Sequence, residues 1–137
     1  MNAFITGILT GALVITVTVL AKQINKQVYY ALTLCGIGFL YVGFTWSDTQ
    51  AFVINSLQAV VFLFLSYYGL KKNGVVLAIG FFLHGGWDLA YGWFSSSSLI
   101  PPHYDIFCLT ADLTIGTYLL YINLKFSKQT AGKFYRQ

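Results

Sequence analysis

Five long runs of apolar residues fill most of this 137-residue chain and constrain its fold more than any other feature. A helix needs about 20 consecutive apolar residues to cross the hydrocarbon core of a bilayer. Each run is continuously apolar, without the two-residue alternation that is typical of a transmembrane β-barrel strand. The pattern therefore predicts an all-α, polytopic integral membrane protein. We expect residues 1–124 to form a bundle of five transmembrane helices, at about 3–21, 28–46, 51–70, 75–94 and 106–124.

The low content of charge supports a membrane location. Charged residues make up 9% of the chain, whereas soluble globular domains contain about 25%. Eight basic and four acidic side chains cannot provide the polar surface that a soluble domain of this size needs. The composition therefore disfavours a soluble enzyme, a disordered chain and a nucleic-acid-binding domain. We expect the lipid bilayer to be the main partner, and no nucleic acid to be bound.

The basic residues predict how the chain is threaded through the membrane. With five spans, all eight fall on one side: in the loop at 22–27, in the turn at 71–74 and in the tail at 125–137. Loops rich in Lys and Arg mark the cytoplasmic side of membrane proteins. This distribution predicts an outside N-terminus and a basic cytoplasmic tail over residues 125–137.

Two of the four acidic residues lie inside predicted spans, where charge is expensive. Asp88 and Asp112 are each about six residues from the outer end of their span, roughly 9 Å deep at 1.5 Å per residue. A charged group at the bilayer centre costs about 2.5–3.5 kcal/mol on insertion scales, so a buried ionisable residue indicates function. The two carboxylates are expected at similar depth on adjacent helices.

Helical spacing adds other polar side chains to these carboxylates. His84 lies four residues before Asp88 and therefore on the same face, one turn deeper. The expected result is a polar layer open to the outside, above an apolar floor. We select His84, Asp88 and Asp112 as candidate catalytic residues and, if a metal is bound, as its ligands. The candidate ligand-binding residues in the same layer are Asn55, Gln58, Trp87, Tyr91, Asp105 and Cys108.

Structural interpretations compete with the functional ones at each position. The aspartates could be protonated and hydrogen-bonded between helices, and the amides could serve helix packing. Glycines predict close helix contacts. Gly7 and Gly11 have small-xxx-small spacing on the first span. We expect a similar role for Gly36, Gly38 and Gly43 on the second span and for Gly80, Gly85 and Gly86 on the fourth.

The segment from His84 to Asp88 has the pattern His-x-x-Trp-Asp, and Cys108 and Asp112 follow in the next span. In these residues the chain resembles an uncharacterised family of small bacterial integral membrane proteins. Members often carry a further histidine after the Trp-Asp pair, and Tyr91 stands in that region here. The resemblance implies a bacterial inner membrane location and supports the site, but it implies no reaction.

Several hypotheses about function follow from these features. The first is a protein that binds a small ligand or ion, with proton-linked transport, because paired carboxylates and a histidine are common in proton relays. The second is an intramembrane enzyme that acts on a lipophilic substrate, with His84 and Asp88 or Asp112 as acid and base. The third is a divalent-metal site. The fourth is an accessory or pigment-binding subunit. Five spans are few for a complete pathway, so we expect a homo-oligomer or other membrane subunits.

Overall fold

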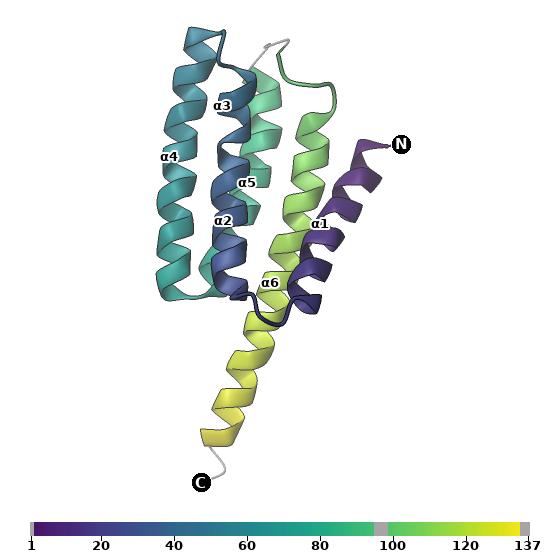
Figure 1. The fold of residues 1–137 in the computed structure, drawn as a ribbon, viewed down its shortest axis with the longest axis vertical. Helices are drawn as coiled ribbons and strands as arrows, with labels where there is room; N and C mark the ends of the chain where they lie inside the picture. Colours follow the sequence, from purple (N-terminus) through teal and green to yellow (C-terminus); the bar gives the residue numbers. More distant parts are fainter. Residues whose placement is uncertain (1, 95–98, 135–137) are drawn as a thin grey trace.

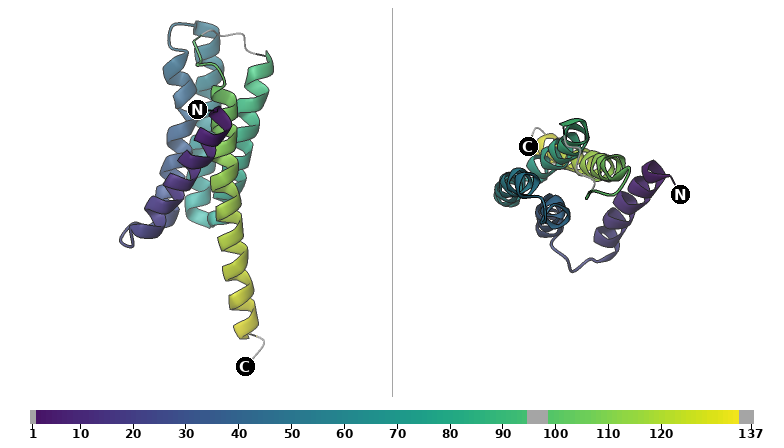
Figure 2. Two further views of the ribbon diagram at one scale, coloured as in Figure 1. Left: turned by 90° about the vertical axis from the view of Figure 1, so that its right-hand side faces the viewer. Right: turned by 90° about the horizontal axis from the view of Figure 1, so that it is seen from above.

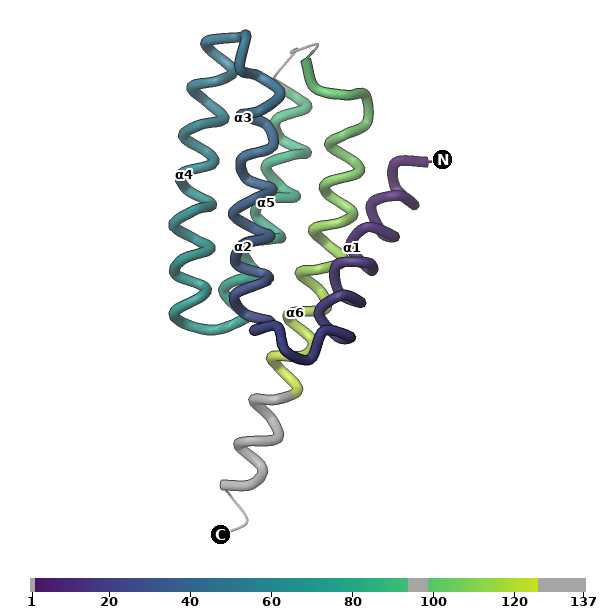
Figure 3. The backbone as a smooth tube through the Cα atoms, in the orientation of Figure 1, coloured from purple at the N-terminus to yellow at the C-terminus, as the bar shows by residue number. Residues whose placement is uncertain are grey.

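In residues 2–94 and 99–134, whose backbone the computed structural model describes, the chain forms α-helices and no strand. Side chains are described for residues 2–93 and 99–125. Residues 95–98 of the predicted outer loop, and the tail side chains beyond Lys125, lie outside this set. Figure 3 follows the backbone up and down the bundle from the N-terminus. The helices are α1 (Ala3–Leu20), α2 (Lys26–Gly38), α3 (Leu40–Phe44), α4 (Thr49–Lys72), α5 (Gly74–Phe94) and α6 (Tyr104–Phe134).

Five helical stretches are long and apolar enough to cross a membrane. Helices α2 and α3 together form one of them, and the part of α6 up to Lys125 forms another. The prediction of an all-α chain with five helices of membrane-spanning length is therefore confirmed. The stretches are Ala3–Leu20, Lys26–Phe44, Thr49–Lys72, Gly74–Trp93 and Tyr104–Lys125.

The second stretch is interrupted at Phe39, whereas the sequence predicted an unbroken helix. The Phe39 N–H donates to the carbonyl oxygen of Gly36 at 3.1 Å, three residues back, which tightens the last turn of α2. Gly36 and Gly38 favour a break here, because glycine is about 1 kcal/mol less favourable than alanine inside a helix. The chain resumes as α3, and Tyr41 in its first turn is buried at 1% exposure.

Polar residues at the helix N-termini explain where the spans begin. The Asn25 side chain accepts hydrogen bonds from the backbone N–H groups of Gln27 and Val28 at 3.1 and 3.2 Å. Asp48 caps α4 in the same way through the N–H of Ala51, at 3.1 Å. Each cap satisfies backbone donors that have no partner inside the helix. The short polar loops therefore begin the next helix as well as separating the apolar runs.

Helix α5 lies at the centre of the bundle and packs against α6, α4 and α2. Helix α1 stands at the edge and packs mainly on α6, as Figures 1 and 2 show. One end of the bundle contains the loop with Lys22, the last turn of α4 with Lys71 and Lys72, and the start of α2. We call this the lysine end, and the opposite end, where α1 begins, the far end.

Glycines make the contact between α1 and α6 possible. A Cβ atom on Gly7 would overlap the hydroxyl of Thr110 and the carbonyl oxygen of Phe107. A Cβ atom on Gly11 would lie 2.9 Å from the carbonyl oxygen of Ala111. The two backbones thus approach as small-xxx-small spacing allows. The packing role predicted for this pair is confirmed.

The other glycines divide into two groups. A Cβ on Gly38 would lie 3.1 Å from Phe62, and one on Gly80 would overlap Leu34, so both positions need a small residue. The prediction was wrong for Gly36, Gly43 and Gly86, where no atom of the described residues lies within 4 Å of an added Cβ. Spacing in the sequence identified glycines, but it did not distinguish those that face a neighbouring helix.

The lysine half of the bundle contains the apolar core. Its buried members come from α2, α4, α5 and α6, and the α5 members precede His84 while the α6 members follow Asp112. This core closes the bundle between the polar residues and the lysine end, as the expected apolar floor would. It consists of Tyr30, Ala31, Leu34, Phe62, Leu77, Ala78, Phe81, Ile115 and Leu119.

Candidate functional site

Three ionisable side chains converge between α5 and α6. Nδ1 of His84 lies 2.8 Å from Oδ2 of Asp112 and 3.2 Å from Oδ2 of Asp88. One nitrogen therefore faces two carboxylates from two helices. We call His84, Asp88 and Asp112 the triad. The sequence predicted that these three residues would form one site, and the structure brings them together.

The triad is enclosed by protein. The exposed fractions are 1% for His84, 0% for Asp88 and 3% for Asp112. His84 lies ten residues from each end of α5 and therefore halfway along it. At 1.5 Å per residue, the site is roughly 15 Å from either end of that helix. An ion or proton that reaches the triad has to pass between packed side chains.

Gly85 explains why α6 comes close enough to supply Asp112. A Cβ on Gly85 would lie 3.3 Å from Cβ of Asp112 and 3.2 Å from Leu109, tighter than ordinary packing. The residue next to His84 is therefore a contact point between the two helices. On α4, the Phe62 ring packs edge-on against the His84 imidazole, with 4.8 Å between the ring centroids. The histidine is held between α4 and α6.

A second polar layer lies toward the far end. The Asn55 amide donates to the hydroxyl of Tyr91 at 3.0 Å and to the hydroxyl of Thr45 at 3.1 Å. The Thr45 hydroxyl in turn donates to the carbonyl oxygen of Tyr41 at 2.7 Å. This network ties α4 and α5 to the end of α3. Asn55 and Tyr91 thus belong to the surroundings of the triad and not to the triad itself.

Tyrosines that sequence reasoning missed complete these surroundings. The ring of Tyr41 lies 5.1 Å from that of Tyr91 and 5.8 Å from that of Tyr104, centroid to centroid. Tyr41 also interacts electrostatically with Asp88. Nothing in the sequence separates Tyr41 from the other nine tyrosines, because its position depends on the break at Phe39.

The remaining predicted residues occupy different positions. Gln58 follows Asn55 by three residues on the inward face of α4 and is 5% exposed. Neither polar atom of its amide has a hydrogen-bond partner among the described residues. Trp87 stacks near Tyr91, with 6.1 Å between the ring centroids. Asp105 lies against Gly92, since an added Cβ there would be 3.2 Å from its carboxylate. Cys108 is buried one turn before Asp112, beside Tyr104.

Replacing Asn55 with alanine should destabilise the protein by about 1–3 kcal/mol, because two hydroxyls lose a buried hydrogen bond. Thermal unfolding of the purified protein in detergent measures this change. Ser56→Ala, at the next position of the same helix, provides the control. Its free energy of unfolding should lie within about 0.5 kcal/mol of that of the unmodified protein. Equal stability of the two variants would show that the Asn55 network contributes nothing.

Fold and site together define a class: an all-helical protein with five helices of membrane-spanning length and a buried triad of one histidine and two aspartates. Residues 2–125 match DUF6010, a family of unknown function, and the chain belongs to this family. The predicted membership of an uncharacterised family is therefore confirmed. No curated protein and no solved structure matches the chain.

Proposed function

We propose that this chain is an integral membrane protein whose triad binds a divalent cation in exchange for protons. The proposed membrane is the bacterial inner membrane, with the N-terminus outside and the C-terminus in the cytoplasm. The positions of the lysines and the membrane-spanning length of five helices support this arrangement. The observation that carries the function is that three buried side chains each offer a ligand atom and that these atoms all lie within 4.8 Å of one another.

The spacing of these atoms suits a metal ion. Bonds of about 2.0–2.2 Å from imidazole nitrogen and carboxylate oxygen place neighbouring ligand atoms roughly 3 Å apart around the ion. The two contacts of His84 Nδ1 measure 2.8 and 3.2 Å, and all three donor atoms lie within 4.8 Å of one another. One imidazole with two carboxylates favours a first-row divalent ion such as Zn²⁺ or Mn²⁺ over Mg²⁺ or Ca²⁺.

The charge of the triad supports the same proposal. Two carboxylates buried in an apolar bundle need positive charge nearby, because an unpaired buried charge costs several kcal/mol. The lysines whose side chains the structure describes all lie at or beyond the lysine end of the bundle. Neutrality within the triad therefore takes two protons or one divalent cation. The state with two protons and the state with one divalent cation have the same net charge, and this equality is the basis of the proposed exchange.

Buried amide atoms of α4 also lack hydrogen-bond partners within the part of the chain that the structure describes. Both amide atoms of Gln58 and Oδ1 of Asn55 are buried without a hydrogen-bond partner in the described residues. Buried polar groups are nearly always paired in native proteins. Together with the two buried carboxylates, these unsatisfied polar groups support a bundle interior that holds an ion.

Isothermal titration of the detergent-solubilised protein with Zn²⁺ and with Mn²⁺ tests this function. We expect one ion per chain, and Asp112→Asn or His84→Ala should weaken binding by at least about 100-fold, because each removes a ligand. Asp48→Asn and His103→Ala make the same chemical changes outside the triad. Asn caps a helix as well as Asp does, so Asp48→Asn should also preserve the fold. Equal binding by triad and control variants would refute the site.

Transport is the proposed consequence of this exchange, and a homo-oligomer is its proposed assembly. Proteoliposomes loaded with a metal-sensitive dye should take up the cation faster when their lumen is more acidic than the outside. Each ion that enters then exchanges for protons that leave down their gradient. Asp112→Asn proteoliposomes should show no uptake above that of empty liposomes. Binding without uptake would limit the function to a cation-binding subunit.

A further inference from the structure

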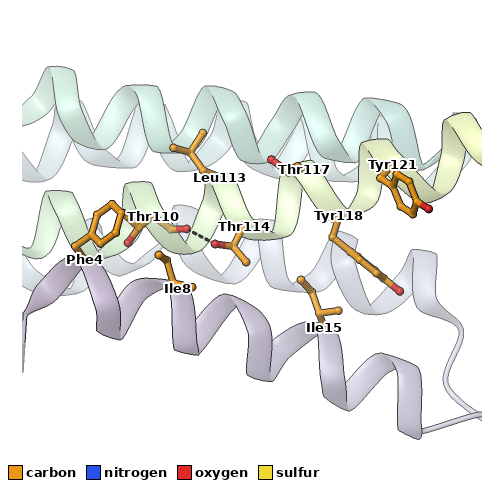
Figure 4. Close-up of a pocket in the computed structure, with 9 residues that line it drawn as sticks. All are labelled: Phe4, Ile8, Ile15, Thr110, Leu113, Thr114, Thr117, Tyr118 and Tyr121. Atoms are coloured by element: carbon orange, nitrogen blue, oxygen red, sulfur yellow. Dashed lines mark hydrogen bonds between the residues drawn. The ribbon is translucent and has the colours of Figure 1, made fainter.

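A surface groove runs between α1 and α6. Its volume is about 620 Å³. The helices touch at Gly7 and Gly11, so side chains on either side of this contact form the groove walls. Figure 4 shows these walls along the two helices. The lining residues are Phe4, Ile8, Ile15, Thr110, Leu113, Thr114, Thr117, Tyr118 and Tyr121.

The groove is apolar toward the far end and becomes polar toward the lysine end. The hydroxyls of Thr110 and Thr114 donate to carbonyl oxygens of their own helix, at 2.9 and 2.7 Å, and are therefore satisfied locally. The hydroxyls of Tyr118 and Tyr121 lie at the end of the groove away from Phe4, as Figure 4 shows. A ligand along this groove would meet hydrocarbon surface first and hydroxyl groups last.

A positive charge stands at the polar end. Nζ of Lys125 lies 5.9 Å from the centre of the Tyr121 ring, and Tyr121 is 61% exposed. Lys125 is also the last residue of the membrane-spanning part of α6. Tyrosine rings prefer the headgroup level of a bilayer, and lysines there attract anionic headgroups. The polar end is thus suited to a phosphate group.

We propose that this groove binds one anionic phospholipid from the leaflet at the lysine end. An acyl chain lies between α1 and α6, and the phosphate is held by Lys125 and the Tyr121 hydroxyl. The order of apolar and polar surface along the groove matches that of a lipid, and the charge matches an anionic headgroup. This site is separate from the triad and does not depend on cation binding.

Native mass spectrometry of protein released from nanodiscs of equal phosphatidylglycerol and phosphatidylcholine tests this site. We expect one retained phosphatidylglycerol per chain. Lys125→Gln should lower the ratio of retained phosphatidylglycerol to phosphatidylcholine about fivefold, because one lysine contact is lost. Lys72→Gln is the matched control: Nζ of Lys72 lies 5.7 Å from the Tyr68 ring, outside the groove, and the ratio should not change.

A second variant tests the acyl-chain position. Thr117→Phe fills the groove and should reduce retention of both lipids, while Val61→Phe, on the exposed surface of α4, should not. Equal lipid ratios for Lys125→Gln and Lys72→Gln would overturn the headgroup assignment. A chain dimer without bound lipid, or full retention by Thr117→Phe, would overturn the groove as a lipid site.

Discussion

Divalent-cation binding should tighten about 100-fold for each unit rise in pH, over the range in which the empty triad holds two protons. The cation binds to a neutral imidazole and two ionised carboxylates, so its entry releases both protons. The association constant then rises with the inverse square of the proton concentration. Titration calorimetry in two buffers of different ionisation enthalpy, at several pH values, measures the number of protons released.

The variants make this prediction specific. Asp48→Asn changes an acid outside the triad and should still release two protons per ion. Asp112→Asn removes one acid from the triad, so each ion that this variant still binds should release one proton. Its association constant should therefore change only about tenfold per pH unit. Proton release near zero in the unmodified protein would contradict the charge balance on which the proposed exchange rests.

Replacing Gly7 with alanine should lower stability by about 1–3 kcal/mol or more, because the new methyl group overlaps Thr110 and the backbone of Phe107. Alanine is the better helix former by about 1 kcal/mol, so local propensity alone predicts the opposite sign. Thermal unfolding in detergent distinguishes the two. A Gly7→Ala protein as stable as the unmodified one would mean that α1 does not pack on α6 as described.

Gly86→Ala is the matched control for this experiment. No atom of the described residues lies within 4 Å of a Cβ at Gly86, so the substitution should be neutral or stabilising. The same chemical change at two helical glycines is thus expected to act in opposite directions. Reduced stability in both variants would assign the effect to glycine flexibility and not to helix contact.

Much of the fold could be predicted because apolar runs and helices coincide in this chain. The run at 3–21 corresponds to Ala3–Leu20, and the turn expected at 71–74 is reduced to Asn73, because α4 continues to Lys72 and α5 begins at Gly74. The exact ends of the helices were harder to predict, because they depend on backbone conformation at single residues and not on the length of an apolar run. Helix α6 begins at Tyr104, two residues earlier than expected, directly after His103, which has a positive φ of 62°.

The triad could be predicted because ionisable residues are rare in apolar runs and each one is conspicuous. His84 and Asp88 share a face by their spacing, and Asp112 reaches them because the small Gly85 lets α6 approach. Of the tyrosines around the triad, Tyr91 could be predicted from its spacing to His84 and Asp88, but Tyr41 and Tyr104 could not. In a chain with 18% aromatic residues, neither composition nor spacing sets Tyr41 apart, and its burial in α3 after the break at Phe39 is apparent only in the structure.

The position of α6 has a consequence for how the protein is made. Helix α6 is the last of the five membrane-spanning stretches to leave the ribosome, and it provides both the partner of α1 and the second carboxylate of the triad. Until α6 arrives, His84 and Asp88 lack Asp112, and the first span lacks the helix on which it packs. In the membrane arrangement that we propose, α5 and α6 would insert together as a hairpin, and the assembly of the triad and the docking of α1 would be one late event in biogenesis.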